Sequence, residues 1–209
     1  MASPLTDLAD MTAAPLEDVA LAIAAEFRTV DLEGAHANLD RLAEGMEGLA
    51  ARPPEDRAQR LLHGLVERHG LGATTCGCPD GLMLDQVLDL RRGHPLALCI
   101  VHVAVARRAG FELHVAGSDE VVVVGDPCSR PALLIDPVPG GRRLPDDLHW
   151  LCPHVVGSRL LTHLVARFSA RGAIADAIRA AELRLLFPLA AKTRDRHEIE
   201  LRAIRARLN

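Results

Sequence analysis

His94 and Cys99 are the first candidates for chemistry, because a thiolate can attack a carbonyl carbon while an imidazole takes up or returns the proton. Cys99 follows Pro95 by about one helical turn, so it would share a side of the helix with that residue. It could be a displaced nucleophile or a small apolar core residue, a common role of buried cysteine. His94 could be a base at the start of the helix or a solvated turn residue. His102 could contact Cys99 along the helix or be a hydrogen-bonded core residue.

Charged residues in two adjacent pairs could act on a charged ligand. Asp119 and Glu120 could form an acid–base pair or repel an anion, and they could equally be the polar tip of a hairpin. Arg91 and Arg92 could bind a carboxylate or phosphate, or they could be solvated cations near the negative end of a helix dipole. We count Asp119, Glu120 and Arg92 among the candidate binding residues.

The segment Cys76-Gly77-Cys78 is the most unusual local motif of the chain. With His63 and His69 it could ligate zinc, but it lacks the C-x₂-C spacing and a second closely spaced pair of ligands. We therefore predict no metal site, and we predict no cofactor. One of the two thiols could supply a nucleophile, or both could be exposed thiols that are sensitive to oxidation.

The composition limits the classes of protein and partner. A hydrophobic share of 49% excludes a disordered chain, and a net charge of −4 argues against a nucleic-acid-binding surface. No segment reaches the ~18–20 apolar residues of a membrane span, and the acidic N-terminus is unlike a signal peptide. We expect a cytoplasmic protein whose five cysteines are reduced. Its partner would be a protein or a small molecule, and neither a nucleic acid nor a membrane.

The positions of proline, glycine and apolar residues predict the elements that hold these side chains. Residues 1–14 are expected to be flexible. Helices are predicted from Pro15, over 32–51, from Pro54 to a stop at Gly70, over 83–92, and over 95–109, where an apolar helix is ended by Gly110. Strands are predicted over 112–116, 121–124 and 132–135, and helices over 158–171, 174–187 and 193–206.

The order of helices, a small antiparallel sheet and further helices indicates an α+β fold. We divide the chain into a flexible N-terminus (1–14), a core with N-terminal helices (15–157) and a helical, repeat-like tail packed on that core (158–209). The helix over 95–109 is apolar on nearly all sides, which is typical of a buried helix.

Several short segments, taken in order, resemble the transglutaminase-like superfamily and, within it, the SirB-type branch. They are Val87-Leu88, Arg91-Arg92-Gly93, Pro95-Leu96, the run from Val105 to Gly110, Ile135-Asp136-Pro137 and Gly140-Gly141, with Leu160-Leu161, Ala177, Leu185, Pro188 and Arg194-Asp195-Arg196 in the tail. The resemblance covers about Pro15 to Ala206. It implies a papain/transglutaminase-like core, in which a small antiparallel sheet packs on a buried helix that carries a nucleophilic cysteine at its N-terminus.

The resemblance also implies where a Cys–His–Asp triad would lie in this chain. The nucleophile position falls on Pro95, a residue often found there in the SirB-type branch, and the histidine position falls on Val121. The acid is retained as Asp136, although an Asp-Pro after a strand can simply cap a turn. Proline cannot attack a carbonyl and valine cannot take up a proton, so the ordinary mechanism is not available from these positions.

Two functions remain as alternatives. In the first, the triad is degenerate and the protein binds a partner through its helical tail or through a pocket whose binding residues are Pro95, Asp119, Glu120, Arg92, Cys76 and Cys78. In the second, the protein is an enzyme of altered acyl-transfer, amide-forming or cyclising chemistry. Asp136 would then act with His94, Cys99 or a loop cysteine.

Overall fold

The computed structural model describes residues 4–138 and 144–208 and has the expected α+β class. The predicted turn at Gly140-Gly141 lies outside the described residues. The helices are α1 (Pro4–Asp10), α2 (Leu16–Ala25), α3 (Leu32–Ala43), α4 (Pro54–His63), α5 (Leu84–Leu90), α6 (Pro95–Arg108), α7 (Pro153–Ala170), α8 (Ile174–Arg184) and α9 (Ala191–Arg205). The strands are β1 (Gly72–Ala73), β2 (Arg92–Gly93), β3 (His114–Gly117), β4 (Val122–Asp126), β5 (Leu133–Ile135) and β6 (His149–Leu151).

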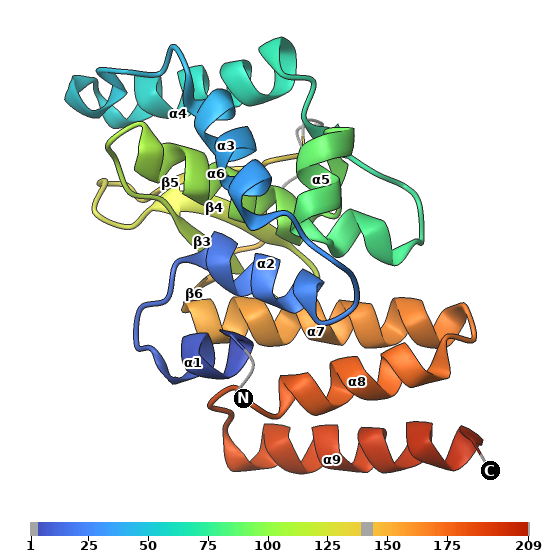
Figure 1. Ribbon diagram of the computed structural model, residues 1–209. Helices are drawn as coiled ribbons and strands as arrows, with labels where there is room; N and C mark the ends of the chain where they lie inside the picture. Colours follow the sequence, from blue (N-terminus) through green and yellow to red (C-terminus); the bar gives the residue numbers. More distant parts are fainter. Residues whose placement is uncertain (1–3, 139–143, 209) are drawn as a thin grey trace.

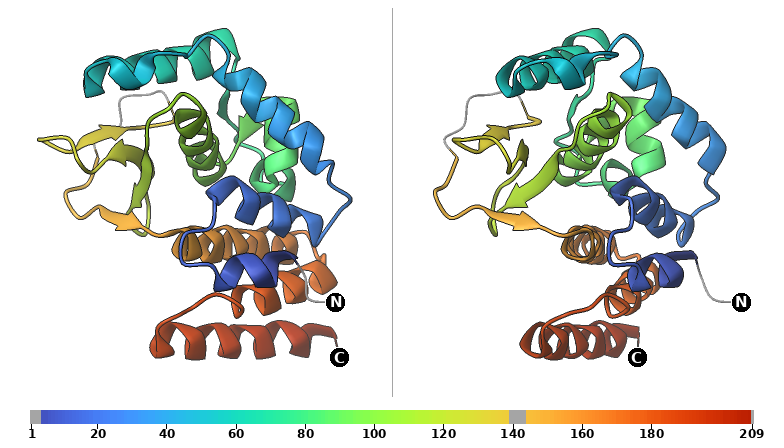
Figure 2. Two further views of the ribbon diagram at one scale, coloured as in Figure 1. Left: turned by 60° about the vertical axis from the view of Figure 1, so that its left-hand side comes forward. Right: turned by 90° about the vertical axis from the view of Figure 1, so that its left-hand side faces the viewer.

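Helix α6 is the centre of the core. Pro95 occupies its first turn, where the missing N–H is not needed, and Gly110 follows its end with a φ of 85°, which glycine adopts without strain. Ten of its fourteen residues are buried. The sheet lies on one side of α6, and α2, α3 and α5 lie on the other (Figure 2). The expected buried helix over 95–109 is therefore present, with an end one residue earlier.

The main sheet is antiparallel and has the order β5-β4-β3-β6. Three of its strands lie where alternating β-rich residues predict them. Strand β6 was not predicted: it is three residues long and pairs with β3 through Trp150 opposite Ala116. Val115, Val123 and Val124 are almost fully buried, so the two central strands supply the apolar surface of the sheet.

The tail forms successive layers beneath the core, with α7 against α2, α8 against α7 and α9 against α8 (Figure 1). Arg184 of α8 has no exposed surface and joins these layers. It donates hydrogen bonds to Thr162 of α7 (3.2 Å) and to Glu200 of α9 (2.6 Å). Helix α7 begins at Pro153, so the expected division between core and tail at residue 158 falls inside a continuous helix.

Three other elements differ from the expectations. Helix α1 lies in the segment expected to be flexible, and its Leu5 and Ala9 are buried. Helix α3 ends at Ala43 rather than near residue 51, and Leu49–Ala51 forms a separate 3₁₀ turn. The helix from Pro54 passes into a π-helical turn over Gly64–Arg68 before Gly70.

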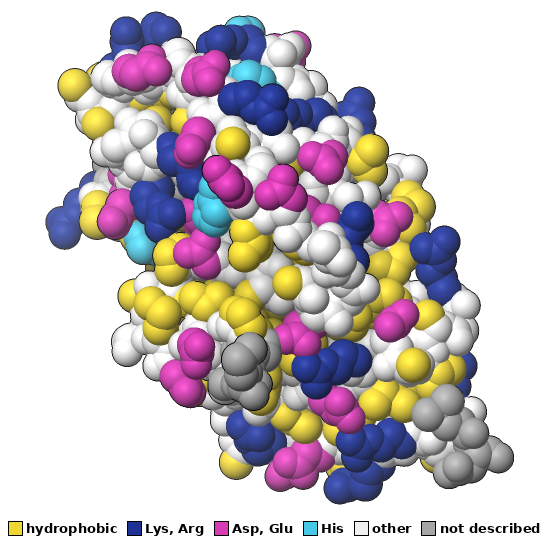
Figure 3. All heavy atoms as spheres, in the orientation of Figure 1, with side chains coloured by type: hydrophobic (Ala, Val, Ile, Leu, Met, Phe, Trp, Pro, Cys, Tyr) yellow, Lys and Arg dark blue, Asp and Glu magenta, His cyan; other side chains and the backbone are white. Residues whose placement is uncertain are grey.

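The surface is mixed in charge, as acidic and basic side chains are interspersed over the face seen in Figure 3. Within the described ranges, no helix has the length and apolar character needed to cross a membrane.

Candidate functional site

Four of the predicted site residues, His94, Pro95, Asp119 and Glu120, line one cavity of about 540 Å³ at the N-terminal end of α6. We call this cavity the tail pocket, because much of its wall comes from α7, the α8–α9 connection and α9. The tail residues that line it are Val155, Ser158, Arg159, Thr162, His163, Pro188, Leu189, Ala190, Thr193, Arg196 and His197.

The ring of His94 is fixed by the backbone at the start of α6. Its Nδ1 accepts a hydrogen bond from the Leu96 N–H (3.2 Å), and the backbone N–H of His94 donates to the Gly81 carbonyl (2.7 Å). Because Nδ1 is an acceptor, the proton of the neutral ring lies on Nε2. Burial, together with His163 and Arg167, lowers the pKa of His94 to about 4. At neutral pH this ring is therefore uncharged and offers a hydrogen-bond donor rather than a base.

Two further histidines of the tail line the same pocket. The ring of His163 lies against His94, with 4.4 Å between the ring centroids, and burial lowers the pKa of His163. His197 is 5% exposed, and its Nδ1 has no hydrogen-bond partner among the described residues. Burial and the neighbouring Arg184 and Arg196 lower the pKa of His197 as well. The pocket therefore presents uncharged imidazoles that can donate to or accept from a ligand.

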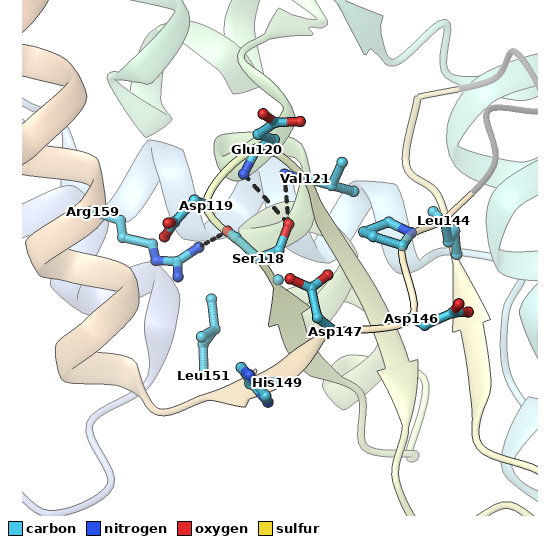
Figure 4. Close-up of a pocket in the computed structure, with 12 residues that line it drawn as sticks. Ser118, Asp119, Glu120, Val121, Leu144, Asp146, Asp147, His149, Leu151 and Arg159 are labelled. Atoms are coloured by element: carbon cyan, nitrogen blue, oxygen red, sulfur yellow. Dashed lines mark hydrogen bonds between the residues drawn. The ribbon is translucent and has the colours of Figure 1, made fainter.

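Asp119 and Glu120 occupy the tip of the β3–β4 hairpin, as the plainer interpretation of this pair expects. The turn is held by the Ser118 hydroxyl, which accepts from the Glu120 and Val121 N–H groups at 3.4 Å each. Arg159 reaches from α7 to donate to the Ser118 carbonyl (2.6 Å), and its side chain lies beside Asp119 (Figure 4).

The hairpin tip also forms a wall of a second cavity, which we call the hairpin pocket. It has a volume of about 720 Å³ and is bounded on its other side by residues 144–147, His149 and Leu151. Asp119, Glu120 and Arg159 line both cavities, so the tip separates them.

The charges of the tail pocket come from different parts of the chain. Its carboxylates, Asp119 and Glu120, belong to the hairpin, and its guanidinium groups, Arg159 and Arg196, belong to the tail. Because the imidazoles are neutral at pH 7, these two pairs balance. Prolines and aliphatic side chains complete the lining, so the pocket suits a ligand that has both charges and an apolar part.

The two positions that the family resemblance assigns to a cysteine and a histidine lie in different cavities. Pro95 lines the tail pocket, and Val121 lines the hairpin pocket. No described residue that lines either cavity is a cysteine.

Cys99 and His102 lie inside the protein and Asp136 is half-buried, and none of the three lines either of these two cavities. Cys99 and His102 have no exposed surface, and His102 Nδ1 donates to the Leu98 carbonyl (2.8 Å). Burial lowers the pKa of His102 to about 4, with Asp136 acting weakly in the opposite direction. The Asp136 carboxylate accepts from the Val138 N–H (2.9 Å), which is the turn-capping role that its Asp-Pro context allows.

The remaining predicted binding residues lie outside both cavities. Arg92 is on β2, and its guanidinium covers Gly72 of β1: a Cβ added to Gly72 would lie 2.1 Å from Arg92 Nη1. Cys76 and Cys78 lie on the loop between β1 and the 3₁₀ turn Pro79–Leu82. No three His, Cys, Asp or Glu side chains in the described part of the chain are placed so that they could hold a metal ion.

Sequence reasoning missed the tail side of the pocket. Arg159 and His163 are four residues apart on α7, a spacing that puts them on one face of a helix, but it does not show what that face meets. Arg196 and His197 lie in the N-terminal half of α9 and belong to the pocket because of how α9 packs on α8.

A comparison with known families agrees with this architecture. The family model described as transglutaminase-like superfamily matches residues 33–172. No curated protein and no solved structure matches the chain. The matched range includes α6, the hairpin and α7, whereas Pro188–His197 lie beyond it, so the tail pocket is built from the family domain and from a segment that follows it. Because the match covers most of its length, the chain belongs to the transglutaminase-like superfamily.

Proposed function

We propose that this protein is a binding or accessory member of the superfamily, of the SirB-type branch, with a degenerate triad, and that its tail pocket holds a protein segment or small molecule. The observation that carries the proposal is the identity of the residues at the start of α6. Pro95 lines the pocket there, while Cys99, one turn further, has no exposed surface. The carbonyl of an acyl donor in the pocket would therefore meet no thiol from α6.

The state of His94 supports binding over catalysis. A general base needs an unprotonated nitrogen that faces the reactant, but Nδ1 of His94 already accepts the Leu96 N–H. The ring is left with the Nε2 proton, which can hold a carbonyl or carboxylate oxygen of a ligand. Its pKa of about 4 keeps this donor present over the physiological pH range.

The balanced charges indicate the class of ligand. A peptide with free termini, or an amino-acid-like small molecule, would place its ammonium group near Asp119 and Glu120. Its carboxylate would lie near Arg159 or Arg196. The apolar wall of Pro95, Val155 and Leu189 would cover an aliphatic side chain.

An altered acyl-transfer enzyme remains the second candidate, and the Cys76–Cys78 loop favours it. The Thr74 N–H donates to the Gly93 carbonyl (2.9 Å) and the His94 N–H to the Gly81 carbonyl (2.7 Å), so both ends of the loop are attached to the two residues that precede α6. Cys76 is exposed on this loop, and its thiol could act on a ligand that extends out of the pocket.

The experiment incubates the full chain with tripeptides that have free termini and with the same peptides acetylated and amidated. We expect the free peptides to raise the Tm and to bind in calorimetry, and we expect to recover them with unchanged mass. Arg196→Gln should weaken binding, whereas Arg202→Gln, a control outside the pocket on the same helix, should not. A peptide whose mass changes in the wild type but not in Cys76→Ser would overturn the proposal in favour of the enzyme. No binding of either peptide set would contradict the peptide-like ligand.

A further inference from the structure

The loop that carries Cys76 and Cys78 holds the two cysteines close together. The Cys78 N–H donates to Cys76 Sγ (3.2 Å). The Cys76 N–H in turn donates to Thr74 Oγ1 (3.1 Å), which fixes the loop on the side of β1. Cys76 is exposed and Cys78 is half-buried, so Cys76 is the more accessible of the two residues.

Two arginines, Arg167 of α7 and Arg171 directly after its end, lie beside this pair. A Cβ added to Gly77 would lie 2.9 Å from Arg167 Nη1, so the absence of a side chain at Gly77 lets this guanidinium approach the loop. Arg171, one turn further along the chain, acts electrostatically on Cys76. Neither arginine has an acidic partner within 4.0 Å among the described residues, so both charges remain available to an anion.

The environment divides the roles of the two sulfurs. The hydrogen bonds from the Cys78 thiol and N–H lower the pKa of Cys76, and Arg171 acts in the same direction. The same contact and partial burial raise the pKa of Cys78. A more acidic outer thiol and a less acidic inner thiol are the arrangement in which the first attacks an incoming disulfide and the second resolves the product.

We propose that Cys76 and Cys78 form a thiol–disulfide exchange site whose substrate is an anionic low-molecular-weight disulfide. The Cys76 thiolate attacks one sulfur of the substrate, forms a mixed disulfide and releases the other half as a thiolate. Cys78 then gives its proton to solvent and attacks Cys76 Sγ, which breaks the mixed disulfide and releases the second half. Two protein thiols are oxidised to one disulfide, and one external disulfide is reduced to two thiols.

The other exposed cysteines provide matched controls within the same chain. Cys128 follows β4 and Cys152 precedes α7, and each is exposed without a second cysteine nearby in sequence. They can form mixed disulfides but have no resolving thiol of this kind. Neither Cys76 nor Cys78 lines the tail pocket, so the exchange reaction does not require a ligand there.

The test equilibrates the reduced full chain with mixtures of reduced and oxidised glutathione, blocks remaining thiols with N-ethylmaleimide and analyses the tryptic peptide over residues 69–91. Cys76 and Cys78 are the cysteines of that peptide. We expect it to lose both thiols together and to gain an internal disulfide without a glutathione adduct. In Cys78→Ser the same peptide should carry one glutathione on Cys76. Cys128→Ser and Cys152→Ser should leave both results unchanged.

Two results would overturn the proposal. One is a wild-type peptide that accumulates the glutathione adduct without an internal disulfide. The other is a Cys76 that reacts no faster than Cys128 and Cys152.

The role of the arginines has its own measurement, the initial rate at which Cys76 attacks an anionic and a neutral aromatic disulfide. Arg171→Gln and Arg167→Gln should slow the reaction with the anionic reagent by about threefold or more and should affect the neutral reagent less. If the variants react with the anionic reagent as fast as the wild type does, an anionic substrate is contradicted.

Discussion

Two parts of helix α6, its N-terminal end and its buried middle, differ in the space and the reactive groups that they offer. The N-terminal end, at His94 and Pro95, opens into a cavity of about 540 Å³ but has no thiol. The interior one or two turns further along holds a thiol, an imidazole and a nearby carboxylate, Cys99, His102 and Asp136, but Cys99 and His102 have no exposed surface. Space for a ligand and reactive groups are therefore separated along one helix. Changes in the interior should alter stability, and changes in the pocket should alter binding.

The largest expected effect is a loss of stability in acid that originates in the interior. The pKa of His102 is about 4 in the folded protein and 6.5 in its ordinary state, so the unfolded chain takes up the proton first as the pH falls. The contribution of the neutral His102 ring to the free energy of unfolding is therefore complete above about pH 6.5. It is lost as the pH falls from 6.5 to about 4, and the loss amounts to about 3 kcal/mol. His94 acts in the same direction.

Urea unfolding at about pH 7.5 and about pH 4.5 measures this loss. We expect His102→Gln, which keeps a donor for the Leu98 carbonyl, to lose clearly less stability between the two pH values than the wild type. An equal loss in both proteins would show that His102 is not the buried group responsible.

A smaller effect is expected from the buried thiol. Cys99→Ser places a hydroxyl in an apolar environment and should lower the free energy of unfolding by roughly 1–3 kcal/mol. Cys99→Ala, which adds no polar group, should cost less. Peptide affinity measured by calorimetry should stay the same in both variants. A loss of binding in Cys99→Ala without loss of stability would break the separation between interior and pocket.

The smallest effect is expected at the charged wall of the pocket. Asp119 and Arg196 are both exposed, so Asp119→Asn and Arg196→Gln should each change the unfolding free energy by no more than about 0.5 kcal/mol. Each should weaken binding of a tripeptide with free termini by roughly three- to tenfold, because one charged contact is lost. Calorimetry with the blocked peptides is the control, and an equal loss for free and blocked peptides would contradict this role.

The sequence was informative where local signals are strong. Pro95 and Gly110 mark the start and end of α6 within one residue, and the β-rich runs mark β3, β4 and β5. Helix α1 and strand β6 could not be predicted, because their few residues are stabilised by packing and pairing with distant parts of the chain. The early end of α3 was missed although it has a local signal, because Gly45 follows Ala43 by two residues and has a φ of 76°, as is typical of a glycine that ends a helix.

The candidate site was predictable on one side only. His94, Pro95, Asp119 and Glu120, which the sequence singled out, line one cavity at the start of α6. Cys99 and Arg92 were candidates on residue type, and Asp136 was the acid that the family resemblance implies. None of them lines either cavity, because Cys99 is buried, Asp136 caps its own turn and Arg92 covers Gly72. His163 and His197 could not be assigned, because the packing of α7, α8 and α9 decides which of their faces meets α6.

Site-resolved labelling with iodoacetamide tests the separation on α6 most directly. In the native wild type, Cys99 should be labelled far more slowly than the exposed Cys128 and only as fast as the protein unfolds. In Pro95→Cys, the new thiol should be labelled rapidly, because it lies at the pocket and at the N-terminus of a helix, which favours the thiolate. Labelling of Cys99 in the native wild type at the rate of Cys128 would contradict the account, because it would place a reactive thiol of α6 within reach of a ligand.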